Sequence, residues 1–187
     1  MNAKPQPMSP DEALSLFATT RSRTQALAAP LCPEDMMLQS MEDASPVKWH
    51  LAHTAWFFEE FIIKPRVANY RSPDDRFAVL FNSYYVQAGP RHARDKRGLV
   101  SRPDGAAVRA YRDHVENSLN DLMNASRDDA DEIAQLVELG CHHEMQHQEL
   151  LITDLLHGLS FNPLLPTYKD PEPLAVTDEM PLNFSRH

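Results

Sequence analysis

Residues 141–151 read Cys-His-His-Glu-Met-Gln-His-Gln-Glu-Leu-Leu and lie in a segment with the three-and-four apolar spacing of an α-helix. On a helix that turns about 100° per residue, one apolar stripe forms. The stripe consists of Ile133, Leu136, Val137, Leu151 and Leu155. His147 and Glu144 fall inside this stripe, and His143 lies on its edge. The pattern therefore predicts a long helix that turns two imidazoles and a carboxylate toward the protein core.

Buried polar side chains at these positions need partners. An unpaired buried polar group costs about 1–3 kcal/mol, so aliphatic residues would otherwise be favoured here. His143 and His147 are one helical turn apart on one face, and their ring nitrogens can converge on one ion. A buried hydrogen-bond network is the alternative explanation. The pair beside a carboxylate favours a metal site, which needs at least a third ligand.

Two candidates for the third ligand lie in an earlier helical segment. His50 borders the apolar face of that segment, whereas His53 lies nearer a second face formed by aromatic residues. Periodicity does not choose between them and slightly favours His50. A helix that is apolar on both sides is expected to be central, so either imidazole could point inward.

Start and stop signals divide the chain into four long helical segments. Ser9-Pro10-Asp11-Glu12 forms a capping box for a helix that reaches about Ala28. Further segments are expected from Ser45 to Lys64, from Pro103 onward, and from Asp128 to His157, with Gly158 as the C-cap. Residues 69–102 form a long excursion with room for one short helix. We expect an all-α fold, an antiparallel four-helix bundle with a long connection after the second long helix. Residues 1–168 would form the bundle, and residues 169–187 a proline-rich tail or linker.

Composition excludes several classes of function. The formal net charge of the 187 residues is −9, which argues against non-specific binding to nucleic acid and against an anionic membrane surface. No run of about 18 apolar residues exists to span a bilayer, and residues 1–9 lack the apolar centre of a signal peptide. A cytoplasmic protein is therefore expected. Cys32 and Cys141 are expected to be buried or half-buried free thiols.

Residues 143–147 also match the H-E-x-x-H pattern of zinc peptidases. In those enzymes the two histidines bind zinc and the glutamate activates water. The extended pattern needs a glycine and a third histidine where this chain has Leu150 and Thr153. No strand pattern is available to bind a peptide by edge addition. A peptidase is therefore the least favoured interpretation.

Several ordered motifs resemble a known family. They are residues 45–59 (SPVKWHLAHTAWFFE), 80–85 (LFNSYY), 89–92 (GPRH), 97–103 (RGLVSRP) and 142–154 (HHEMQHQELLITD). Together they resemble the N-terminal DinB-like domain of the ergothioneine sulfoxide synthases (the EgtB type). The likeness covers about residues 8–168. It implies a DinB-like four-helix bundle, consistent with the helical segments.

The resemblance implies a metal, substrates and site residues. The metal would be non-haem iron(II), held by His53, His143 and His147, which would decide between His50 and His53. Zinc or nickel also suits imidazole ligands. The family uses dioxygen to join a thiol, γ-glutamylcysteine or cysteine, to hercynine (trimethylhistidine) as a sulfoxide. Among Arg91, Arg94 and Arg97, the last two are the favoured ligands for the carboxylates of the thiol.

A carboxylate is expected to orient one of the metal ligands. Glu144 is the favoured candidate for this orienting role, although it could instead be merely a buried partner. Asp154 lies on the same arc of the helix and could take the orienting role.

The chain departs from the family in one respect. The sulfoxide synthases continue into a second domain that resembles the formylglycine-generating enzymes and supplies much of the pocket. We therefore expect the chain alone to be incomplete for sulfoxide synthesis, with a separate or missing C-terminal domain as its partner. Two alternatives stay open: a stand-alone DinB-like thiol transferase, and a non-catalytic metal-containing bundle that docks a partner domain.

Overall fold

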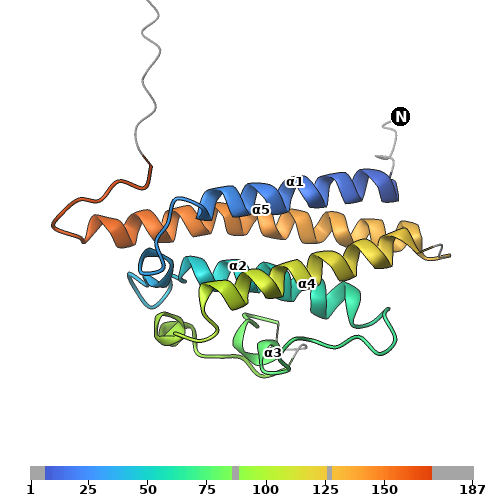
Figure 1. Cartoon of the computed structure of the whole chain (residues 1–187), viewed down its shortest axis with the longest axis horizontal. Helices are drawn as coiled ribbons and strands as arrows, with labels where there is room; N and C mark the ends of the chain where they lie inside the picture. Colours follow the sequence, from blue (N-terminus) through green and yellow to red (C-terminus); the bar gives the residue numbers. More distant parts are fainter. Residues whose placement is uncertain (1–6, 86–88, 126–127, 170–187) are drawn as a thin grey trace, which may run out of the picture.

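Four long helices lie side by side in the computed structural model, which describes residues 7–85, 89–125 and 128–169 (Figure 1). They are α1 (Pro10–Ala28), α2 (Val47–Phe58), α4 (Gly105–Asn124) and α5 (Ala130–Ser160). The described residues contain no β-strand. The expected all-α class is confirmed.

The helices run in two opposing pairs. In Figure 1, α1 and α5 run in one direction, whereas α2 and α4 run in the other. Helix α1 packs along α5, and α2 packs against both α4 and α5. Helix α1 is therefore antiparallel to α2, and α4 to α5, whereas the packed pairs α1–α5 and α2–α4 run parallel. The long connection between α2 and α4 lets both helices start at the same end of the bundle.

Side chains cap the N-termini of two helices, and the first of these caps was predicted from the sequence. The Ser9 hydroxyl accepts a hydrogen bond from the backbone of Glu12, and the Glu12 side chain accepts one from the Ser9 backbone, so the capping box is present. Asp104 caps α4 by accepting a hydrogen bond from Ala107 N at 2.9 Å. The expected end of α5 at His157, with Gly158 as the C-cap, is wrong by three residues, because the helix continues to Ser160.

Helix α2 is the centre of the bundle. Every residue from Val47 to Phe58 is buried, which agrees with its expected central position. A π-helical turn, η2 (Glu59–Ile63), extends it by five residues. The buried Glu59 carboxylate in this turn accepts hydrogen bonds from the hydroxyls of Tyr70 and Tyr111 at 2.8 and 2.5 Å.

The long connection is held against α2 by side chains of α2 itself. It contains the short helix α3 (Phe77–Leu80) and the 3-10 helix η4 (Arg94–Leu99). Lys48 Nζ donates to Val100 O at 2.7 Å, and Trp49 Nε1 donates to Leu80 O at 3.2 Å. The connection therefore covers one side of α2 and supplies one wall of the site.

The two cysteines differ in burial. Cys32 is exposed, contrary to expectation, whereas Cys141 is buried; neither forms a disulfide. None of the helices among the described residues is long and apolar enough to cross a membrane. Residues 161–167 are exposed, whereas Tyr168 is half-buried and its hydroxyl donates to Leu27 O of α1 at 2.5 Å. Residues 170–187 lie outside the described residues, so the domain boundary at residue 168 stays a prediction.

Candidate metal centre

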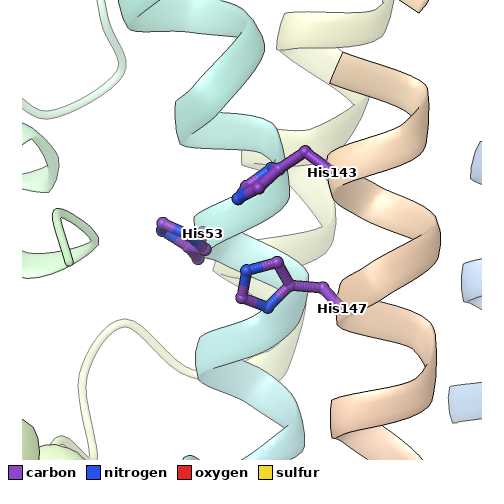
Figure 2. A group of neighbouring side chains, drawn as sticks. All are labelled: His53, His143 and His147. Atoms are coloured by element: carbon purple, nitrogen blue, oxygen red, sulfur yellow. The ribbon is translucent and has the colours of Figure 1, made fainter. Parts of the chain in front are cut away.

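Three histidine rings meet between α2 and α5. Figure 2 shows His53 reaching from α2 and His143 and His147 reaching from α5. The ring centroids are 5.1 Å apart for His53 and His143, and 4.6 Å apart for each of the other two pairs. One nitrogen of each ring lies within 4.8 Å of the corresponding nitrogens of the other two. The structure therefore brings together the three residues predicted as metal ligands, in an arrangement that could hold an ion.

The hydrogen bonds of these rings leave the nitrogens that a metal needs. His53 Nδ1 donates to Phe81 O at 2.6 Å, so in the neutral ring Nε2 carries the free lone pair. His147 Nδ1 lies 2.9 Å from His50 Nδ1, and this contact leaves the Nε2 of His147 free. His143 Nδ1 is buried without a hydrogen-bond partner. Each of the three rings therefore keeps at least one nitrogen free of a hydrogen bond, which fits coordination of a metal ion by three imidazoles.

The electrostatic setting keeps these rings neutral. Burial, followed by the neighbouring His147 and His143 rings, holds the pKa of His53 well below its usual value. Burial lowers the pKa of His143 to about 4. Burial, with the neighbouring His50 and His143, lowers the pKa of His147 to about 2. All three rings therefore offer lone pairs at neutral pH, which metal coordination requires.

His50, the other candidate for the third ligand, lies beside the triad. Its ring is 3% exposed, and its Nε2 lies 3.2 Å from Asp154 Oδ2. Asp154 Oδ2 also accepts a hydrogen bond from Ser45 N at 2.8 Å. Burial lowers the pKa of His50, so the ring is neutral near pH 7. His50 thus contacts His147 on one side and Asp154 on the other.

Glu144 makes contacts that differ from the orienting contact favoured by the sequence. Its carboxylate is fully buried and accepts hydrogen bonds from Arg21 Nη1 and Arg112 Nη2, both at 3.0 Å. Burial acts to raise the pKa of Glu144, but the charges of Arg21 and Arg112 outweigh it and lower the pKa to about 2. These contacts correspond to the alternative that the sequence left open, a buried partner. Asp154 is the carboxylate that is connected to a predicted metal ligand. It contacts His50, which in turn contacts His147.

The triad opens into a pocket of about 610 Å³. Arg94 and Arg97 line this pocket together with the three histidines, so the structure groups all five residues predicted to bind metal or substrate. Arg91 does not line it and instead donates to Ser83 O at 3.1 Å.

Arg97 is the more rigidly held arginine. It is 4% exposed, and its guanidinium carbon lies 3.4 Å from the centroid of a Trp49 ring. Its Nη atoms donate to the hydroxyls of Ser45 and Ser83 at 2.8 and 3.2 Å. Burial, with the charge of Arg94, lowers its pKa to about 10, so the side chain still carries its charge at neutral pH. Its Nε and that of Arg94 are both buried without a hydrogen-bond partner.

A second, more apolar hollow of about 560 Å³ adjoins the first. The two hollows share Tyr85, His143 and Gln146, so His143 stands between them. The aromatic residues of the second hollow are Phe57, Phe61 and Tyr85. Phe57 stacks on the ring of His143 with centroids 4.4 Å apart.

A sequence profile of the DinB superfamily matches residues 16–151, most of the bundle. The chain belongs to the DinB superfamily. This match covers all three histidines of the triad, and it agrees with a metal-binding helical domain. A search of curated proteins found no match to this DinB domain.

Several residues of the site were not assigned by the sequence. Arg97 is held by Trp49, Ser45 and Ser83. Arg94 contacts Tyr84 and Asp43. The motifs that contain Ser45, Trp49 and Tyr84 were visible, but nothing in their spacing indicates which arginine they contact.

His92, His114 and His157 are half-buried and do not line the pocket of the triad. His187 lies outside the described residues.

Proposed function

We propose that this DinB domain binds iron(II) through His53, His143 and His147 and serves an oxygen-dependent sulfoxide synthase. The observation that carries the proposal is the convergence of three neutral imidazoles in an arginine-lined pocket. The ordered motifs that resemble the ergothioneine family support the choice of iron and of substrates. Zinc or nickel would fit the same nitrogen donors.

The proposed reaction balances with dioxygen as the oxidant. A thiol R–SH and the C–H of an imidazole combine with O₂ to give an R–S(=O)–imidazole sulfoxide and one water. Forming the C–S bond takes two electrons and oxidising the sulfur takes two more, which matches the reduction of O₂ by four electrons. Bound iron(II) would supply the activation of dioxygen. The protein supplies neutral ligands, a binding pocket and substrate orientation.

Arg94 and Arg97 would hold the carboxylates of the thiol substrate. Both side chains line the pocket of the triad, and each keeps a buried Nε without a partner. A guanidinium with a free N–H binds a carboxylate by a charge-assisted hydrogen bond. The stacking of Arg97 on Trp49 fixes its plane, so little side-chain entropy is lost when an anion binds.

The apolar hollow on the other side of His143 would take the second substrate. A trimethylammonium group is attracted to aromatic faces, and Phe57, Phe61 and Tyr85 line this hollow. Phe61→Leu should raise KM for hercynine while leaving KM for the thiol unchanged, measured on the enzyme with any second domain it requires. An equal rise in both constants would contradict this assignment of the two hollows.

Anaerobic titration with iron(II) tests the proposal on the chain itself. The wild type should bind one equivalent, and His143→Ala should lose stoichiometric binding. His157→Ala is the matched control, because His157 hydrogen-bonds Ser40 Oγ at 2.8 Å and does not line the pocket of the triad. Equal binding by the wild type and His143→Ala would refute the site.

Oxygen consumption separates the sulfoxide synthase from a thiol transferase. With hercynine and thiol present, the synthase should consume one O₂ for each sulfoxide formed. Product formation without oxygen consumption would instead identify a transferase that uses zinc or nickel. Binding of metal with no turnover after a partner domain is supplied would indicate a non-catalytic bundle.

A further inference from the structure

A chain of hydrogen-bonding groups leads away from the triad. His147 Nδ1 lies 2.9 Å from His50 Nδ1, and His50 Nε2 lies 3.2 Å from Asp154 Oδ2. Asp154 Oδ2 also accepts a hydrogen bond from Ser45 N. The three side chains come from α2 and α5, and His50 is 3% exposed.

Asp154, the last member of this series, sets the direction of the hydrogen bonds between the three side chains. A carboxylate only accepts hydrogen bonds, so the proton of a neutral His50 ring belongs on Nε2. His50 Nδ1 is then an acceptor, and the atom facing it, His147 Nδ1, is the donor. The reverse arrangement would place a bare His50 Nε2 against the Asp154 carboxylate. It would also put the single proton of His147 on Nε2, the atom that the metal needs.

We propose that His50 is a positioning residue: it fixes the proton of His147 on Nδ1 and turns a bare Nε2 toward His53 and His143. The inference rests on the proposed metal site. Figure 2 agrees with it, because one nitrogen of the His147 ring faces the other two rings. His53 is oriented in the same way by Phe81 O, so two of the three ligands are held by partners outside the triad. Partners of this kind typically strengthen metal binding by about 10–100-fold.

The tautomers can be observed directly by NMR. In protein labelled with ¹⁵N-imidazole and loaded with diamagnetic zinc(II), long-range ¹H–¹⁵N spectra should show the His50 proton on Nε2 and the His147 proton on Nδ1. The signals of His50 would be assigned from their loss in His50→Phe. A His50 proton on Nδ1 would overturn the proposal, whatever the activity of the enzyme.

Metal affinity provides the second measurement, by competition for zinc(II) against a chromophoric chelator. His50→Phe should weaken binding by about 10–100-fold. His50→Asn should recover part of this loss, because its Oδ1 can stand near the position of Nδ1 and accept the His147 proton. His157→Phe, which removes the hydrogen bond to Ser40, should leave the affinity unchanged.

The outcomes separate this inference from the metal site. A wild type that does not bind zinc(II) refutes the site itself. A wild type that binds, with His50→Phe binding equally tightly, overturns the role of His50 and leaves the site standing. If His50→Phe does not fold, Asp154→Asn decides: it should weaken binding, because a neutral amide is a poorer acceptor for His50 Nε2–H. Unchanged affinity in that variant would also overturn the proposal.

Discussion

Gly140 of α5 lies directly against the ring of Phe58 of α2. A β-carbon added to Gly140 would fall 2.4 Å from Phe58 Cε1 and 2.8 Å from Phe58 Cζ. The ring has no room to retreat, because it is fully buried and packs edge-on against Phe17 at a centroid distance of 4.9 Å. This contact sets the spacing of α2 and α5 about one turn from His143.

Gly140→Ala should therefore destabilise the protein. Overpacking a buried contact costs about 1–3 kcal/mol, which exceeds the gain of about 1 kcal/mol that alanine brings to a helix interior. Urea denaturation would measure the loss. Gly105→Ala is the matched control, since its β-carbon would meet only Arg109 Nη1 at an ordinary 3.7 Å. A Gly140→Ala protein as stable as the wild type would contradict the close approach of the two helices.

Glu144→Gln should separate folding from metal binding. The change replaces the carboxylate that pairs with Arg21 of α1 and Arg112 of α4 by a neutral amide. Breaking a buried ion pair costs about 3–5 kcal/mol. The folded fraction should still bind one zinc(II), because Glu144 does not line the pocket of the triad. Glu149→Gln, an exposed change on the same helix, serves as the control in denaturation and metal titration. Stability equal to that of the control would count against the ion-pair network.

Acid should destabilise the metal-free protein at a pH where the triad is still neutral in the folded state. The pKa of His143 is about 4 in the fold, against about 6.5 in an unfolded chain. Between these values the unfolded state holds more protons, so the free energy of unfolding falls as the pH decreases.

Urea denaturation with a chelator present, at pH 7.5 and pH 5, would measure this loss. A difference of one proton corresponds to a slope of about 1.4 kcal/mol per pH unit. His143→Gln removes one titrating ring and should reduce the difference between the two conditions. Equal pH dependence in the wild type and the variant would show that His143 is not buried in its neutral form.

The sequence predicted the part of the site that lies on one helix. His143 and His147 share α5, and helical spacing alone places them on one face. On α2, helical spacing could not decide between His50 and His53. A helix that is buried on every side has no polar face that would show which side chains point toward the site. The difference between His50 and His53 comes from partners elsewhere in the chain, namely Asp154 of α5 and Phe81 O of the connection.

Glu144 shows the complementary limit. Periodicity correctly placed its carboxylate in the core, but its partners Arg21 and Arg112 are 123 and 32 residues away along the sequence. Nothing in local spacing indicates that two guanidiniums meet this carboxylate. The π-helical turn after Phe58 was missed for a similar reason, because its buried Glu59 is held by Tyr70 and Tyr111 from outside the turn.

Arg97→Lys should weaken binding of the proposed thiol substrate without affecting metal binding. Lysine keeps the charge but loses the planar group that stacks on Trp49 and bonds Ser45 and Ser83. Loss of one well-placed charge-assisted hydrogen bond corresponds to about a tenfold or greater rise in Kd for γ-glutamylcysteine. Calorimetry on protein loaded with zinc(II) would measure this Kd, and chelator competition would show unchanged metal affinity. Arg102→Lys, an exposed change outside the pocket of the triad, is the control; equal weakening by both variants would remove Arg97 from the substrate site.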